Sequence, residues 1–350
     1  MYTRLVSAAF IFAVFMGTGA SVRADTVTDR IDRLEHELAV LRSELARRDE
    51  LAEQKKADAK PGQESAVSFS PGKLEIKTAD GNFSAGIGGN IQFDGYSLDS
   101  KQFSKSGTGF RRARLFLNGT VYKDWSYLLQ VDFAGNAPLL ATSYIAYRFA
   151  PQTMVYAGYP MEPFGLQNSM SNAATLFMEK PLTGLLWPGN AMGVNLRHSD
   201  GKSYGLNGGI FSIDPVNPTR TGLGDTTGWA VTGRGWGAPV NEVDSSVHVG
   251  LSGSYRNVAG YRDKSRKPYK HDFGTRAEVA NLPIVLATGP LTDVDHIGLI
   301  GPELAVSHGP FELEGEYLLG WVNFRNGRRV KVESGYVEAG AFLRGRAPSL

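Results

Sequence analysis

The segment 108–133 reads TGFRRARLFLNGTVYKDWSYLLQVDF, in which apolar and polar residues alternate along two stretches. Successive side chains of a β-strand point to opposite faces, so each stretch predicts a strand with one apolar face and one largely polar face. Lys123 and Asp124 lie in the short segment between them, which predicts an antiparallel hairpin. Its apolar face must pack on a second sheet, as in a soluble sandwich, or meet lipid, as in an outer-membrane barrel.

The same alternation continues from Lys73 to the C-terminus, where about fourteen strands are expected. Short turns such as 199–202 alternate with long loops such as 213–227, and outer-membrane barrels have this difference between their two ends. Aromatic residues near strand ends resemble the girdles of such barrels. The pattern therefore favours a transmembrane β-barrel over a secreted β-sandwich binding module for glycans or similar ligands. The later expected strands are 143–149, 154–159, 193–198, 203–212, 228–236, 246–256, 273–278, 303–307, 311–317 and 335–343.

Composition agrees with a β protein, because 42 residues are Gly and 11% are aromatic. Beyond the N-terminus there is no apolar run of about 18 residues, which excludes a helical membrane protein. The chain has no Cys, so disulfides and thiolate metal sites are excluded. A net charge of +2 indicates no charged partner, and no nucleic acid is expected.

The N-terminus predicts export from the cytoplasm. Arg4 precedes an apolar run from Leu5 to Met16, and Val22-Arg23-Ala24 has the small residues of a cleavage site. We interpret residues 1–24 as a signal peptide. An apolar anchor helix is the alternative, but the run is too short to span a bilayer.

Residues 25–57 predict a helix that forms a short coiled coil for oligomerisation. Its apolar residues are spaced four, three, four, three and four apart, which is the a/d pattern of a heptad repeat. The alternative is a single surface helix packed on its own domain. Residues 58–72 are polar and predict a linker to the barrel domain, 73–350. The a/d residues are Val27, Ile31, Leu34, Leu38, Leu41 and Leu45.

Four motifs, FRRARL at 110–115, KDWSY at 123–127, EPF at 162–164 and FMEK at 177–180, resemble the phosphate-selective porin O and P family. The resemblance extends from Lys73 to the C-terminus. It implies a homotrimeric porin of the bacterial outer membrane with roughly sixteen strands. It also implies a third loop folded into the lumen and basic residues that bind small anions such as phosphate.

The chain departs from the family pattern at three loop positions. Met161 and Asn190 stand where the family usually has Lys and Arg, and Lys180 replaces an Arg. Lys binds an oxyanion less well than the planar fork of Arg, so a wider, weakly anion-biased pore is expected. Fewer strands are expected than the family has, and the terminal aromatic strand is missing. We expect a C-terminally truncated copy, with closure by fewer strands as the alternative.

The polar faces of the strands supply the expected channel lining. The resemblance implies that the loop between Pro160 and Gly193 forms the constriction of the channel. Arg112 and Arg114 are expected to lie opposite this loop. The alternative for these two arginines is a solvated position on an exposed sheet face. Glu312, Glu314 and Glu316 are likewise expected to be solvated and not to form a cation site. The expected channel-lining and anion-binding residues are Arg112, Arg114, Arg148, Arg197, Lys180, Arg234 and Asp132.

Enzymatic motifs are weak. The sequence GKSYG at 201–205 matches G-x-S-x-G but enters a predicted strand from a turn, whereas a nucleophile elbow lies between a strand and a helix. The six His residues lack zinc-site spacing, and 293–295 lacks the glutamate of a calcium loop. No enzymatic activity, cofactor or metal is therefore expected. The function expected is passive diffusion of small solutes and ions through a water-filled channel.

Overall fold

The structure is a computed structural model that describes residues 35–47, 50, 66–70, 73–99, 104–135, 137–172, 174–213, 228–258, 272–276 and 284–343. The predicted signal peptide lies outside these residues. The chain divides into two compact units, Met1–Glu64 and Ser65–Leu350. In the first unit residues 35–47 are helical. None of the described helices is both long enough and apolar enough to cross a bilayer.

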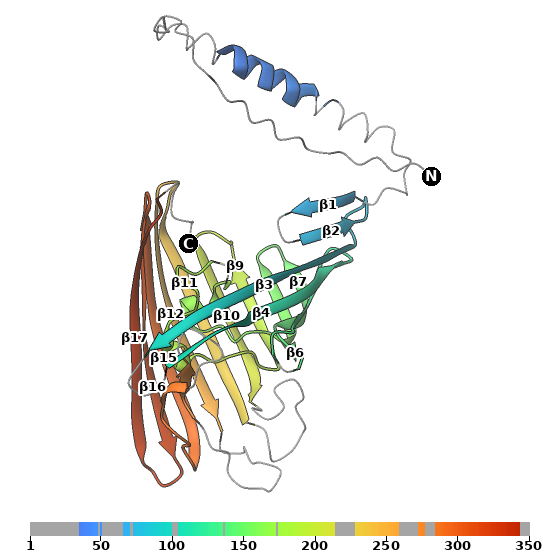
Figure 1. The fold of residues 1–350 in the computed structure, drawn as a ribbon. Helices are drawn as coiled ribbons and strands as arrows, with labels where there is room; N and C mark the ends of the chain where they lie inside the picture. Colours follow the sequence, from blue (N-terminus) through green and yellow to red (C-terminus); the bar gives the residue numbers. More distant parts are fainter. Residues whose placement is uncertain are drawn as a thin grey trace, which may run out of the picture. The chain divides into compact units, whose positions relative to one another are not determined.

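The second unit is a 15-stranded antiparallel sheet in which neighbours in the chain are neighbours in the sheet. Figure 1 shows the sheet bent into a curved wall. In the described residues the path runs from β1 to β17, and these two strands are not paired with each other. The strands on the path are β1 (Ala66–Ser70), β2 (Lys73–Lys77), β3 (Ser84–Asp99), β4 (Ser104–Val121), β5 (Trp125–Asp132), β7 (Ser143–Ala150), β8 (Thr153–Tyr159), β9 (Gly193–Ser199), β10 (Tyr204–Ile213), β11 (Gly228–Asn241), β12 (Ser245–Asn257), β15 (Val294–His308), β16 (Phe311–Phe324) and β17 (Arg329–Ala341), with β6 (Leu139–Leu140) beside β5.

The two ends of the sheet differ in the length of their connections, as the sequence predicts. At one end β4 joins β5 through three residues and β15 joins β16 through two, one of which is Gly309 with a φ of 56°. At the other end the connections from β8 to β9, from β10 to β11 and from β12 to β15 are longer. A barrel strand expected at 273–278 is wrong. Residues of β13 (Gly274–Arg276) instead pair with β14 (Ile284–Ala287) in a separate two-stranded sheet, because a chain excursion between β12 and β15 can form its own hairpin.

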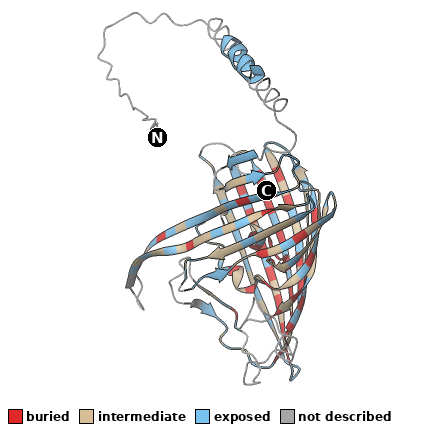
Figure 2. Cartoon of the chain, turned by 90° about the vertical axis from the view of Figure 1, so that its right-hand side faces the viewer, coloured by how far each residue is buried: buried red, intermediate tan, exposed pale blue. Residues whose placement is uncertain are grey.

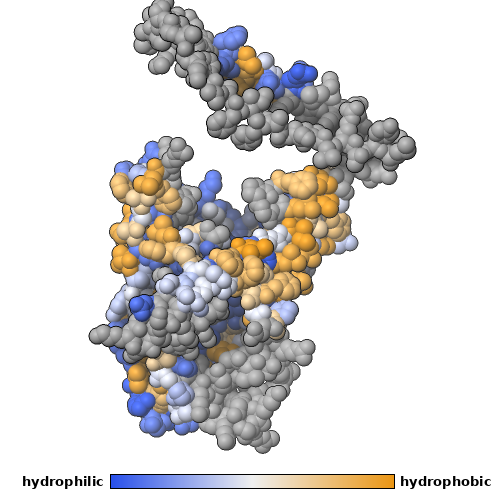
Figure 3. Space-filling model, viewed as in Figure 1, coloured by the Kyte–Doolittle hydropathy of each residue, from blue (hydrophilic) through white to orange (hydrophobic). Residues whose placement is uncertain are grey.

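The apolar rows of the strands face outward. Ile91 in β3 is 76% exposed and Val337 in β17 is 77% exposed, and Leu115 and Leu117 in β4 are also exposed. Figure 2 shows the alternation of exposure along the strands, and Figure 3 shows apolar residues gathered over the first strands. Apolar rows that are not covered by a second layer of protein belong in lipid. The sandwich alternative is therefore wrong, and the fold is an antiparallel transmembrane β-barrel.

The inner face of the sheet carries polar residues and one apolar cluster. Phe211 from β10, Ile297 from β15 and Leu318 from β16 form part of this cluster with Phe164 and Leu186 from the loop between β8 and β9. Burial of apolar side chains contributes about 25 cal/mol per Å², so this cluster stabilises the loop on the inner side of the wall.

Candidate functional site

The loop between β8 and β9, residues 160–192, lies against the concave face of the sheet. Residues 162–168 are all buried, and they include most of the short helix α2 (Leu166–Ser169). Gly165 has a φ of 76°, and a Cβ there would lie 2.9 Å from Glu316 Oε1. Glycine at this position therefore provides both the left-handed backbone and the close approach to the wall.

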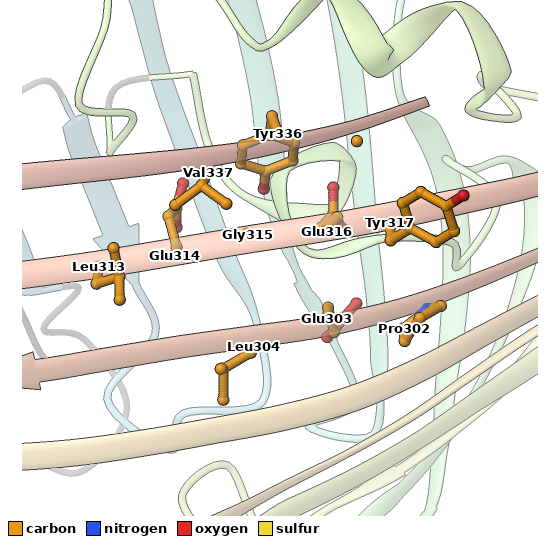
Figure 4. Close-up of a pocket in the computed structure, with 11 residues that line it drawn as sticks. Pro302, Glu303, Leu304, Leu313, Glu314, Gly315, Glu316, Tyr317, Tyr336 and Val337 are labelled. Carbon is orange, nitrogen blue, oxygen red and sulfur yellow. The ribbon is translucent and has the colours of Figure 1, made fainter. Parts of the chain in front are cut away.

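The last strands hold this loop through acceptors on their inner face. The backbone N–H of Gly165 donates to Ser252 Oγ in β12 at 2.8 Å. The backbone N–H of Leu166 donates to the Glu316 carboxylate, and Gln167 Nε2 donates to the Glu314 carboxylate. Figure 4 shows these glutamates on β16, with Glu303 beside them on β15.

The expectation that the acidic residues of β16 are solvated is wrong. Glu314 and Glu316 are 1% and 4% exposed, and Glu312 is also buried. The reason is that backbone and amide N–H groups of the loop need acceptors once water is excluded. In the described residues no cluster of His, Asp or Glu is arranged to hold a metal ion.

A buried ion pair fixes the start of the loop. Glu162, which is 1% exposed, accepts a hydrogen bond from Arg256 Nη1 at 2.7 Å and one from Thr232 Oγ1 at 2.6 Å. The arginine lies on β12 and the threonine on β11. The sequence motif EPF at 162–164 thus joins a charged anchor to Phe164, which is fully buried in the apolar cluster.

The far part of the loop contacts the first strands. Glu179 accepts hydrogen bonds from Arg111 Nη2 at 2.9 Å and from Arg112 Nη1 and Nη2 at 3.1 and 3.0 Å. We call this group of three side chains the arginine clamp. A Cβ at Gly340 in β17 would lie 2.9 Å from Leu176 Cδ2. Because Leu176 and Glu179 are three residues apart, and three residues span at most about 11 Å, the loop reaches both β17 and β4.

A β-bulge explains how two adjacent arginines meet one carboxylate. Gln92 pairs with Arg112 and Phe93 pairs with Phe110, so Arg111 is an extra residue in β4. A bulge redirects a side chain that strict alternation would place on the opposite face. Alternation in the sequence assigns Arg111 to the lipid face, so Arg111 is absent from the expected channel-lining residues.

Further polar contacts continue from the clamp. Arg112 also donates to Gln92 Oε1, and Gln92 Nε2 donates to Asp94 Oδ1 at 3.2 Å. Arg114 Nε donates to Asp132 Oδ2 at 2.8 Å, so this pair lies beside the clamp in neighbouring strands.

Lys180 follows the clamp residue Glu179 in the loop. Its Nζ donates to the carbonyl oxygens of Met170 at 2.9 Å and Asn168 at 3.3 Å. Burial, together with the nearby positive charges of Arg112 and Arg114, lowers the pKa of Lys180 to about 8. The lysine therefore carries its charge at neutral pH and loses it in mildly alkaline solution.

The other predicted arginines are distributed over the inner face. Arg234 in β11 forms an ion pair with Glu303 at 2.5 Å, and His248 lies 2.8 Å from the same carboxylate. Arg197 in β9 is exposed and lines a cavity of about 250 Å³ with Arg234. Arg148 is exposed near the short turn after β7. The loop thus brings Lys180 near Arg112 and Arg114, and Arg114 pairs with Asp132. Its residues 161–163 line the cavity with Arg197 and Arg234, while Arg148 lies apart.

The two positions without the family's charges are neighbours. Met161 and Asn190 face each other in an isolated antiparallel bridge at the base of the loop. Asn190 Nδ2 donates to Thr142 Oγ1 at 2.9 Å and to the carbonyl oxygen of Tyr159 at 3.2 Å. The amide therefore closes the base of the loop and supplies no charge there.

Comparisons with known proteins agree with this architecture. Porin O of Pseudomonas aeruginosa is 29% identical over 283 residues, which cover 71% of this chain and 61% of that protein. An uncharacterised protein of Caulobacter vibrioides is 27% identical over 291 residues, covering 78% of this chain and 56% of the relative. The chain thus spans about three-fifths of the length of these curated relatives.

A solved structure, the outer membrane protein OmpT of Vibrio cholerae in trimer form, matches with a TM-score of 0.33 and 11% identity. The match covers 75% of this chain and 93% of the OmpT chain. That likeness is too low to bear on this chain. The sequence itself matches the family described as phosphate-selective porin O and P over residues 85–349. This protein therefore belongs to the phosphate-selective porin O and P family of bacterial outer-membrane β-barrel proteins.

Proposed function

We propose that the protein forms a water-filled channel across the outer membrane through which small solutes and ions diffuse passively, with a modest preference for anions. The observation that carries this proposal is the arginine clamp beside Lys180, on a loop held at the inner face of the wall. A pore selects ions by the sign and field of its narrowest ring. Cations placed there favour anions in the pathway.

The balance of charges around the arginine clamp and Lys180 supports a weak preference for anions. Four cations, Arg111, Arg112, Arg114 and Lys180, lie with two carboxylates that pair with them, those of Glu179 and Asp132. The cations exceed the carboxylates, but each of the three arginines is already paired with one of these carboxylates. A passing anion therefore meets a positive field whose guanidinium groups are already held by protein carboxylates, which weakens its binding.

The ligand class that best fits this arrangement is a small oxyanion such as phosphate. Guanidinium groups present paired N–H donors that match two oxygens of a carboxylate or a phosphate. Arg197 supports the same class, because it lies exposed beside a cavity of about 250 Å³ on the inner face. It would provide a second contact along the pathway.

The test is a planar-bilayer measurement of the reversal potential in a KCl gradient. Arg112→Ala combined with Arg114→Ala should lower the permeability of anions relative to cations. Arg328→Ala combined with Arg329→Ala removes the same charge near the turn between β16 and β17 and should leave the ratio unchanged. An unchanged reversal potential in the first pair would remove these arginines from the filter, and an absence of channels would overturn the proposal.

We also propose that the protein assembles as a homotrimer with its apolar rows in the lipid of the outer membrane. Leu38, Leu41 and Leu45 support an oligomer, because they are exposed on the described helix in the spacing of a coiled-coil seam. Chemical crosslinking in detergent tests the assembly. Replacing these three leucines with Ser should reduce trimers, and an undiminished trimer band would limit the helix to a surface role.

A further inference from the structure

We propose that the Glu179 carboxylate occupies the anion-binding position of the arginine clamp and is the residue that determines how strongly the pore holds a phosphate-like oxyanion. The inference rests on the proposed channel function and adds to it a competitor built into the loop. A solute anion would bind this position only when the Glu179 side chain is displaced.

The geometry around Glu179 is that of a bound oxyanion. Arg112 contributes both terminal nitrogens, at 3.1 Å to Oε1 and 3.0 Å to Oε2. Arg111 contributes Nη2 at 2.9 Å to Oε2, and its Nε lies 2.6 Å from Oε1. Two guanidinium groups thus surround one carboxylate through four nitrogens, which is the arrangement that binds carboxylate or phosphate oxygens.

The clamp has more donors than one carboxylate can satisfy. Nε of Arg112 is buried without a hydrogen-bond partner, and Nε of Arg111, although 2.6 Å from Oε1 in the ion pair, does not have hydrogen-bond geometry. A buried donor without a partner costs free energy. A phosphate ion has four oxygens, whereas Glu179 offers two, so a phosphate in this position would have acceptors for donors that the glutamate leaves unused.

The clamp is also at the border of the accessible space. The side chain of Glu179 is 11% exposed and that of Arg111 is 29% exposed, and the preceding loop residues Phe177 and Met178 are largely exposed. This differs from residues 162–168 of the same loop, which are all buried. Glu179 therefore lies in the part of the loop that can release its contact while the anchored part stays in place.

A tethered competitor lowers the apparent affinity for a free ligand by the fraction of time that the site is vacant. A group on a short tether acts at a millimolar effective concentration or higher. We therefore expect removal of Glu179 to increase the apparent affinity of the clamp for phosphate about tenfold. Neutralising a carboxylate outside the clamp should change the electric field of the lumen but should not vacate this position.

The experiment measures the block of chloride current by inorganic phosphate through single channels of the full chain. The variants are Glu179→Ala, which vacates the clamp, and Glu179→Gln, which keeps its shape without the charge. Glu333→Gln, which removes one carboxylate from the outward-facing row of β17, is the matched control for net charge. A heat-modifiable gel shift verifies that each variant folds.

We expect Glu179→Ala to lower the half-blocking phosphate concentration about tenfold, and Glu333→Gln to leave it unchanged. Adding Arg111→Ala and Arg112→Ala to Glu179→Ala should abolish the gain. Channels whose phosphate block is the same in Glu179→Ala, Glu179→Gln and wild type would overturn the inference while the channel function stands. An equal gain in Glu333→Gln would also overturn it, because the effect would then be that of net charge alone.

If no variant conducts, the proposed channel fails and the clamp is tested directly by calorimetric titration of the detergent-solubilised protein with phosphate. Tighter binding by Glu179→Ala than by wild type supports the clamp in that case. Equal binding overturns it.

Discussion

Removing the arginine that pairs with Glu162 should detach the start of the loop from the wall. Arg256 Nη1 lies 2.7 Å from Glu162 Oε2, and the glutamate side chain is 1% exposed. Breaking a buried ion pair by removing one partner costs about 3 to 5 kcal/mol, because the remaining charge is buried without compensation. In Arg256→Ala, only the hydroxyl of Thr232 still donates to this carboxylate, so we expect a loss in this range.

Urea unfolding in detergent, followed by tryptophan fluorescence, measures the loss as a change in the free energy of unfolding. The fully buried Phe164 provides a local readout. Chymotrypsin should cut after Phe164 in Arg256→Ala and not in wild type, because the anchored part of the loop has left the wall. The same release should increase the conductance and its fluctuations in planar bilayers.

The double variant Arg256→Ala with Glu162→Gln distinguishes a buried charge from lost packing. A neutral amide at Glu162 avoids the uncompensated charge and can still accept from Thr232, so we expect recovery of about 2 kcal/mol relative to Arg256→Ala. Arg197→Ala is the matched control, since it removes an exposed arginine from the same face and should change stability by less than about 0.5 kcal/mol. A double variant no more stable than Arg256→Ala would refute the reasoning.

Three further outcomes follow from the same contacts. The pKa of Lys180 is lowered to about 8, so its positive charge is present at pH 7 and lost by pH 9. Reversal potentials measured over this pH range should therefore show a falling preference for anions. Lys180→Arg should remove this pH dependence. Met161→Lys adds a cation at the base of the loop and should raise the anion-to-cation permeability ratio about fivefold, because a unit charge at 4 Å contributes about 1 kcal/mol in water. The neutral variant Met161→Gln should leave the ratio unchanged. Leu129 lies on the outward row of β5 between Trp125 and Phe133. Leu129→Arg should lower the free energy of unfolding by about 2 to 4 kcal/mol, measured by urea unfolding in lipid vesicles. An equal loss in the inward variant Gln130→Arg would contradict the assignment of faces.

The fold was largely predictable because one period governs most of the chain. Alternation with a period of two sets which row faces outward, and the exposed Ile91, Leu115 and Val337 follow it. The boundaries of the last strands were less predictable. β15 begins at Val294, although alternation was recognised only from 303, because residues 297–302 read IGLIGP and have no polar residue on either face, where the inner side packs on the loop.

The site was only partly predictable, since its partners come from distant parts of the chain. Arg112 and Lys180 could be selected from residue type and resemblance. The pairing of Glu179 with Arg111 could not, because it depends on a register shift opposite Gln92 and Phe93. The bulge changes the phase of the alternation, because the exposed Phe110 has the opposite parity to the exposed Leu115 and Leu117. This phase change, together with the adjacent charges Arg111-Arg112, was the signal that could have suggested it.

The distribution of charge along the chain has two different uses, and this limits what a count of lumen charges can say about selectivity. The basic residues of β4 retain a positive field next to the clamp, whereas the buried Glu314 and Glu316 of β16 accept hydrogen bonds from the amide of Gln167 and the backbone N–H of Leu166. Acceptors engaged in this way are enclosed between loop and wall, where a passing ion does not contact them. If they were part of the ion pathway, Glu314→Gln would alter the permeability ratio. Since they hold the loop, we expect Glu314→Gln to lower the stability of the loop, as measured by chymotrypsin cleavage after Phe164, with the ratio unchanged in channels that keep their loop.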